Sequence, residues 1–211
     1  MAELRHLERK GMQAQRGVSS ATLLEVNDRL SQVLRGEYAI MGGQAVRLWT
    51  GSEPRNTDID ILVRREITRG EFQQLSRLGL QYSVSDLYEK GLVYTAPRSQ
   101  PVRVDIVYRF GDLDVSADRV VRNRVMLPVP RDESISNAGK AAELPVMDIP
   151  TLVALKALRG QGKDWEDIKR LAANYDGLTI TDWQKGLITQ VLRDGTLTAQ
   201  ERAAGLAAVL R

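Results

Sequence analysis

Three aspartates lie where the sequence alternates between polar and apolar residues. Asp58 and Asp60 belong to the run Asp-Ile-Asp-Ile-Leu-Val, and Asp105 belongs to Val-Arg-Val-Asp-Ile-Val. This period of two is typical of a half-buried strand, where side chains two residues apart share a face with Cα atoms about 6.6 Å apart. Carboxylates placed in this way repel one another, and a bound cation removes the repulsion. Strands disfavour aspartate, so surface positions on strand edges explain the pattern less well than a site for Mg²⁺, which prefers oxygen ligands.

A pair of glycines precedes the first of these strands. Residues 38–41 are a short, mostly apolar run, Gly42 and Gly43 interrupt it, and residues 44–49 have the length and composition of a short helix. Paired glycines adopt backbone angles that other residues avoid, and the start of a helix presents free N–H groups and a positive end to an anion. Alone, the pair could be only a tight turn. Ahead of the aspartate strand, it predicts contact with the phosphates of a nucleoside triphosphate.

These features together resemble the nucleotidyltransferase superfamily that includes DNA polymerase β. The matching residues are Met41-Gly42-Gly43, then Asp58-Ile59-Asp60-Ile61, and Asp105 as the third carboxylate on a neighbouring strand. The resemblance implies transfer of a nucleoside monophosphate from an NTP to a hydroxyl group, with pyrophosphate leaving. It implies that Asp58 and Asp60 hold two Mg²⁺ ions, and that Asp105 holds the catalytic ion and helps to deprotonate the acceptor. It also implies that Gly42 and Gly43 let the backbone approach the triphosphate.

A second stretch narrows the resemblance. Residues 144–172 are similar to the region after the catalytic core in bacterial abortive-infection (AbiEii-type) toxin nucleotidyltransferases. In those proteins a lysine on one helix is followed, after a short basic turn, by an aspartate at the next helix. The corresponding residues are Lys156 and Asp164, with Asp167 one turn further on. The resemblance implies that Lys156 neutralises phosphate charge and that Asp164 helps to bind the nucleotide.

The residues of this second stretch also have structural interpretations. Lys156 could be a solvated helix residue. Asp164 could cap the second helix, or it could pair with Lys163 or Arg159. The spacing alone does not choose between these roles and a catalytic one.

Three further residues are candidates for nucleotide binding. Gln44 directly follows the glycines, at a position where the toxin-type members usually have serine or threonine, so a hydroxyl that could bind phosphate is missing there. Arg55 and Thr57 precede the Asp-x-Asp strand. The alternative for both is that they only shape the loop.

The pattern of elements predicts an α/β (α+β) fold, a mixed sheet with flanking helices followed by a C-terminal helical bundle. The 211 residues, 43% of them hydrophobic, can bury a sizeable core. We expect an α/β core with an N-terminal helix over residues 1–147 and a helical region over 148–211. The expected strands are 38–41, 58–62, 80–84, 92–95, 102–108, 124–129 and 143–147. The expected helices are 20–34, 69–78, 115–123, 149–159, 163–174, 179–193 and one from residue 198 onward.

Composition excludes several other classes of function. The chain has no cysteine, which excludes disulfides and thiolate metal sites. His6 is the one histidine, so zinc or histidine general-base chemistry is not expected. No run of 18 apolar residues is present, which predicts no membrane span. The charged N-terminus lacks an apolar signal core, and we therefore expect a cytoplasmic protein.

The acceptor of the transferred group is left open by the sequence. The net charge of +3 is compatible with nucleic acid without requiring it. Candidate acceptors are RNA (a tRNA end in particular), a protein hydroxyl, or a small molecule such as an aminoglycoside. Two basic groups favour RNA slightly: Arg5, Arg9, Lys10 and Arg16, and Arg119, Arg122 and Arg124. The resemblance further implies the toxin of a toxin–antitoxin or phage-defence system with a cognate antitoxin protein; the alternative is a non-catalytic antitoxin or nucleotide-sensing module.

Overall fold

The computed structural model describes residues 17–53, 55–83, 90–94, 101–108, 117–129, 142–159 and 162–173. The basic residues of the N-terminal arm and the helices expected over 179–193 and from 198 fall outside these ranges. The division into two domains at residue 147 stays a prediction. Among the described helices, none is long and apolar enough to cross a membrane.

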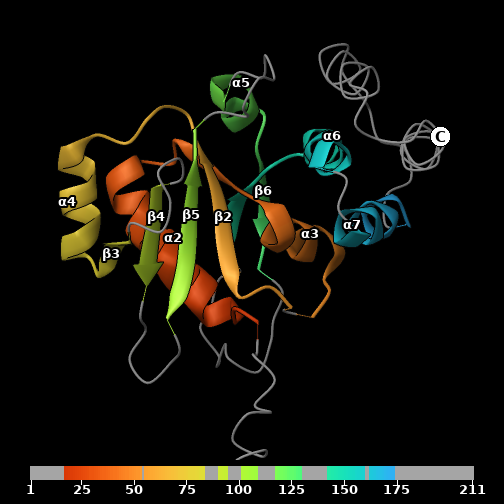
Figure 1. Cartoon of the computed structure of the whole chain (residues 1–211), viewed down its shortest axis with the longest axis horizontal. Coiled ribbons are helices and arrows are strands. Elements are labelled where there is room, and N and C mark those ends of the chain that lie inside the picture. The colour runs from red at the N-terminus through yellow and green to blue at the C-terminus, as the bar shows by residue number, and fades with distance from the viewer. Residues whose placement is uncertain are drawn as a thin grey trace, which may run out of the picture.

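A seven-stranded mixed sheet forms the centre of the described chain (Figure 1). Its strands are β1 (Tyr38–Met41), β2 (Asp58–Val63), β3 (Leu80–Ser83), β4 (Lys90–Tyr94), β5 (Val102–Val107), β6 (Val125–Pro128) and β7 (Glu143–Val146). They follow the order β3-β4-β5-β2-β1-β7-β6. The β2–β5 and β1–β7 pairs are parallel, and the other neighbours are antiparallel. The predicted mixed sheet with flanking helices is confirmed, and every predicted strand is present with ends shifted by two residues at most.

Six helices accompany the sheet within the described residues. They are α2 (Ser20–Leu34), α3 (Gly42–Thr50), α4 (Arg69–Arg77), α5 (Ala117–Arg122), α6 (Ile149–Arg159) and α7 (Gly162–Ala173). Helix α4 begins with a capping box, in which Thr68 Oγ1 accepts from the N–H of Glu71 and the Glu71 carboxylate accepts from the N–H of Thr68. Helices α6 and α7 pack against each other and against α3. This arrangement brings the segment after β7 next to the helix that the glycine pair begins (Figure 1).

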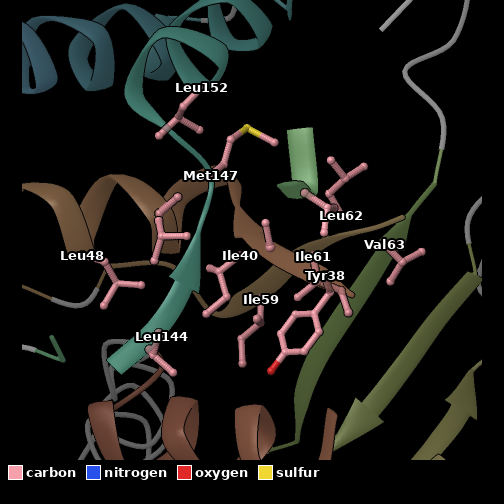
Figure 2. Packing of buried hydrophobic residues seen from close by; sticks show 14 of the residues in the cluster. Tyr38, Ile40, Leu48, Ile59, Ile61, Leu62, Val63, Leu144, Met147 and Leu152 are labelled. Atoms are coloured by element: carbon pink, nitrogen blue, oxygen red, sulfur yellow. The ribbon is translucent and has the colours of Figure 1, made fainter. Parts of the chain in front are cut away.

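The hydrophobic core lies around the central strands β1 and β2 (Figure 2). Tyr38, Ile40, Ile59 and Ile61 are fully buried there, and burial of each such side chain contributes about 1.5–3 kcal/mol. Because successive residues of a strand point to opposite faces, burying Ile59 and Ile61 turns Asp58 and Asp60, which alternate with them, to the other face. The core packing therefore fixes the direction of the two aspartates on β2.

Candidate active site

The three predicted metal ligands lie together on neighbouring strands. One carboxylate oxygen each from Asp58, Asp60 and Asp105 lies within 4.8 Å of the other two. The parallel pairing of β2 and β5 produces this, because its register places Asp60 directly opposite Asp105. We call these three residues the carboxylate cluster. Carboxylate oxygens are the ligands that Mg²⁺ prefers, so the donor set fits a divalent cation.

The pKa of Asp60 reflects both its burial and the repulsion within the carboxylate cluster. Burial, and then the charges of Asp58 and Asp105, raise the pKa of Asp60 from 3.8 to about 6. The positive charges of Arg159 and Lys156 partly oppose this rise. Full ionisation of the cluster therefore costs free energy, which a bound cation would offset.

An arginine that sequence analysis did not single out joins the cluster. Arg103 lies opposite Asp58 in the β2–β5 register, and its Nε donates a hydrogen bond to Asp105 Oδ1. The Arg103 side chain is 42% exposed, whereas that of Asp105 is 14% exposed. The period-two pattern could have identified Arg103, because it precedes Asp105 by two residues and so shares its face.

The first glycine of the pair begins α3 and lies against the cluster. Gly42 has φ +62°, a left-handed conformation that favours glycine. A Cβ atom added at Gly42 would lie 1.9 Å from Oδ2 of Asp60. Helix α3 starts here rather than at residue 44, and Met41, its N-cap residue, provides no side-chain hydrogen bond to the helix start. Glycine is therefore required both by the backbone angle and by the close approach of the Asp60 carboxylate.

The second glycine lies against a different residue, one that sequence analysis missed. A Cβ atom added at Gly43 would lie 2.2 Å from Nδ2 and 2.4 Å from Cγ of Asn56. The amide of Asn56 thus lies against the first turn of α3. Asparagine is common in loops, so its position two residues before Asp58 gave no distinguishing signal.

Gln44 connects α3 to the loop that leads into β2. Its side chain is buried, and its Nε2 donates to the carbonyl oxygens of Asn56, at 3.3 Å, and Asp58, at 3.1 Å. These contacts hold the backbone from which the carboxylate cluster starts. Arg55 and Thr57 are both exposed in this loop. The structure therefore brings Gln44 to the loop backbone and leaves Arg55 and Thr57 at the surface.

Lys156 and Asp164 meet in a network of charges between α6 and α7. Lys156 is 4% exposed, and its Nζ lies 3.3 Å from Asp164 Oδ1 and 2.7 Å from Asp167 Oδ2. Arg159 donates from Nε to Asp164 Oδ2 at 2.8 Å and from Nη2 to Oδ1. We call these four residues the helix-pair network. Pairing of Asp164 with Arg159, one of the structural interpretations, is thus present, together with an ion pair to Lys156.

The helix-pair network stabilises its central carboxylate in the charged form. Burial alone would raise the pKa of Asp164, but the hydrogen bond from Arg159 and the charge of Lys156 outweigh it and hold the pKa below its usual value. Lys156 and Arg159 also act on Asp60, whose pKa they lower. The two cations of the network therefore act on the carboxylate cluster as well as on Asp164.

No family model and no curated protein matches the sequence. Among solved structures, the lincosamide antibiotic adenylyltransferase LnuA, bound to lincomycin, is 18% identical, with a TM-score of 0.47 over 76% of this chain and 100% of that one. The nucleotidyltransferase toxin MenT4 from Mycobacterium tuberculosis is 18% identical, with a TM-score of 0.47 over 83% and 65% of the two chains. JHP933 from Helicobacter pylori is 14% identical, with a TM-score of 0.43 over 89% and 88%.

Proposed function

We propose that this protein is a Mg²⁺-dependent nucleotidyltransferase, which moves a nucleoside monophosphate from an NTP to a hydroxyl acceptor and releases pyrophosphate. The observation that carries this proposal is the carboxylate cluster beside the start of α3. Three carboxylate oxygens lie within 4.8 Å of one another, and Gly42 allows the backbone to lie against Asp60. A nucleotide triphosphate brings anionic oxygens to such a site, and its metal ions accept ligands from both protein and phosphate.

The residues of the chain have distinct roles in this proposal. Asp58, Asp60 and Asp105 would hold two Mg²⁺ ions. When bound, two such ions stabilise both the attacking and the leaving oxygen of the displacement. A carboxylate oxygen of Asp105 accepts the proton of the acceptor hydroxyl as that hydroxyl attacks. The N–H groups at the start of α3, at Gly42 and Gly43, bind phosphate oxygens at the positive end of the helix.

The helix-pair network supplies the positive charge. Lys156 contributes through the field that it places near Asp60, because its Nζ is already held by Asp164 and Asp167. Arg159 has a side chain that is 47% exposed and can neutralise the leaving pyrophosphate directly. Asp164 positions both cations and has no contact with the nucleotide in this scheme.

Transfer of radiolabel tests the proposal. The purified chain is incubated with each of the four α-labelled NTPs, Mg²⁺, and total cellular RNA and protein. We expect a labelled macromolecule that disappears with EDTA and with Asp60→Asn. Asp28→Asn is the matched control, because Asp28 is an exposed carboxylate on α2 that accepts a hydrogen bond from Gln32 one turn further along the same helix. Absence of label with every NTP and every acceptor class, small molecules included, would contradict the proposal.

The salt dependence of binding identifies the acceptor class. RNA binding releases counterions, so six contacts to a single strand give a log–log slope of roughly −4 to −5. A small-molecule acceptor gives little such dependence. We favour RNA, including tRNA, and a role as the toxin of a toxin–antitoxin or phage-defence system, with an antitoxin protein as partner. Fluorescence anisotropy with tRNA across a salt series checks this; no binding at low salt removes RNA from the candidates.

A second candidate is a non-catalytic antitoxin or nucleotide-sensing module. The observation that favours it is the hydrogen bond from Arg103 to Asp105, which provides the third carboxylate with a cation from the chain itself. Such a module binds NTP with Mg²⁺ and turns over none of it. Calorimetric binding without label transfer would select this candidate.

A further inference from the structure

We propose that the side-chain amide of Asn56 is a binding contact for the triphosphate of the nucleotide. This inference rests on the proposed function and adds to it a residue that the sequence pattern did not identify. The contact assigned is a hydrogen bond from Nδ2 of Asn56 to a non-bridging phosphate oxygen.

The position of Asn56 is the first argument. Its side chain lies so close to Gly43 that an added Cβ would be 2.2 Å from Nδ2 and 2.5 Å from Oδ1. Gly43 is the second residue of α3, and the N–H groups of this first turn have no side-chain cap. Asn56 also precedes the metal ligand Asp58 by two residues. The amide thus lies against the helix start, and the backbone of Asn56 leads within two residues into the strand that carries the carboxylate cluster.

The backbone that carries this amide is held from both sides. The carbonyl oxygen of Asn56 accepts from the N–H of Val18, at 2.7 Å, and from Nε2 of Gln44, at 3.3 Å. The carbonyl oxygen of Val18 in turn accepts from Nη1 of Arg47, a buried residue of α3, at 2.9 Å. Two helix residues and the segment before α2 therefore fix the position of Asn56, which a preorganised ligand contact requires.

The amide itself has donor and acceptor capacity to spare. Asn56 is half-buried, and its side chain makes no hydrogen bond to the described residues. A packing residue over Gly43 would need only bulk, whereas an amide can donate to phosphate and is neutral beside three carboxylates. Hydrogen bonds to a charged acceptor are stronger than neutral ones. The chemistry of the side chain thus matches an anionic ligand in an acidic site.

Isothermal titration with two probes tests the assignment. The probes are a non-hydrolysable ATP analogue and inorganic tripolyphosphate, both with saturating Mg²⁺. For Asn56→Ala, we expect the dissociation constants of both probes to rise about tenfold or more, as for the loss of a hydrogen bond to a charged group. A rise for the ATP analogue alone would place the contact on the base or sugar and overturn the phosphate assignment.

The isosteric variant separates binding from packing. Asn56→Asp keeps the shape of the side chain but replaces the donor by a negative charge. We expect binding at least as weak as that of Asn56→Ala, while unfolding in denaturant stays near wild type. If Asn56→Asp binds both probes like wild type, the amide only fills space and the inference is wrong. Asn123→Asp, at an exposed turn after α5, controls for the added charge alone.

Gly43→Ala tests the same contact while leaving the Asn56 side chain chemically unchanged. Its added methyl must displace the Asn56 side chain, so we expect a similar loss of affinity. In the double variant Gly43→Ala/Asn56→Ala, the fold-rise in the dissociation constant should be much smaller than the product of the two single fold-rises, because both substitutions remove the same contact. A fold-rise equal to that product would contradict the assignment.

The same titrations distinguish this inference from the proposed function. If the wild-type chain binds neither probe with Mg²⁺, the proposed function and the inference both fail. If the wild type binds and all Asn56 and Gly43 variants bind equally well, the function stands and only the role of Asn56 is overturned.

Discussion

The carboxylate cluster and the helix-pair network both bring aspartates together, but the two groups differ in the balance of negative and positive charge. In the cluster, three aspartates lie within 4.8 Å of one another, and the pKa of Asp60 rises to about 6 because of burial and its like-charged neighbours. In the network, Asp164 is fully buried and yet keeps a pKa below its usual value, because Arg159 and Lys156 contact it.

The two groups differ in where the compensating positive charge comes from. A buried charge with its partners supplied by the chain contributes to holding α6 against α7. Carboxylates that the fold keeps together with fewer cations than negative charges cost stability, and the proposed Mg²⁺ would supply the charge that Arg103 alone does not. Substitutions in the two groups should therefore act on different measurable quantities.

The largest expected effect is on transfer. Asp60→Asn should lower NTP transfer by roughly 10³-fold or more, because the reacting phosphate loses electrostatic stabilisation. The variant should remain folded, since removing one of three like charges relieves repulsion. Label transfer and denaturant unfolding are measured on the same preparation. Near-normal turnover at saturating Mg²⁺ would remove the carboxylate cluster from the mechanism.

The helix-pair network should respond in stability. Asp164→Asn removes the carboxylate that accepts from the half-exposed Arg159 and leaves the buried Lys156 with Asp167 alone, and we expect a loss of about 1.5–3 kcal/mol in the free energy of unfolding. Asp167→Asn should cost less, because Lys156 keeps Asp164. Glu166→Gln, which breaks an exposed pair with Lys169, should change stability by less than about 0.5 kcal/mol. Equal losses of unfolding free energy for all three variants would contradict the view that buried pairing in the helix-pair network stabilises the fold.

Gly42 links the backbone to the cluster and can be tested against a matched glycine. Gly42 and Gly51 have nearly the same φ, +62° and +63°, but an added Cβ meets Asp60 at 1.9 Å at the first position and nothing within 4 Å at the second. Both alanine substitutions should cost about 1–2 kcal/mol for the left-handed conformation. Gly42→Ala alone should also lose Mg²⁺-dependent nucleotide binding, as measured by calorimetry. Equal binding by the two variants would show that the contact with Asp60 has no functional weight.

The smallest effect is in the pH dependence of stability. The pKa of Asp60 is raised on folding, from 3.8 to about 6, so its ionisation destabilises the folded state. Without Mg²⁺, the free energy of unfolding should be highest below about pH 3.8, where Asp60 is protonated in both states, and should fall as the pH rises through about 6. After screening, we expect this fall to be about 1–2 kcal/mol at most.

The matched measurement compares wild type with two variants between pH 4 and 7. The free energy of unfolding of Asp60→Asn should rise relative to that of the wild type as the pH rises. Glu71→Gln should show the opposite slope, because the hydrogen bond from Arg65 lowers the pKa of Glu71 to about 2 and its contribution is lost as the pH falls. A flat difference for Asp60→Asn would contradict the repulsion inferred for the cluster.

Local patterns predicted most of what positions the site. Period-two alternation located the strands of Asp58, Asp60 and Asp105 and the face that each aspartate occupies, because the core buries the apolar residues that alternate with them. The same period also places Arg103 on the face of Asp105, two residues along β5. The contact of Asn56 with Gly43 could not be predicted in this way, because it depends on the path of a loop, which no local period encodes.

For the helix-pair network, the sequence predicted the participating residues but not their contacts. Sequence spacing brought Lys156, Arg159 and Asp164 under consideration but left both a structural and a nucleotide-binding role open. The geometry pairs Lys156 and Arg159 each with Asp164, and the charges of these two cations also lower the pKa of Asp60. These ion pairs depend on the packing of α7 against α3 and α6, which sets which charges are buried together.

The stability of the folded chain as a function of Mg²⁺ concentration tests the central claim most directly. If the carboxylate cluster binds Mg²⁺, the free energy of unfolding of the wild type at pH 7 should rise with Mg²⁺, by about 2.7 kcal/mol at 100 times the dissociation constant. Asp60→Asn and Asp105→Asn should lose this rise, whereas Asp28→Asn should keep it. No rise in the wild type, or an equal rise in Asp60→Asn, would contradict the account.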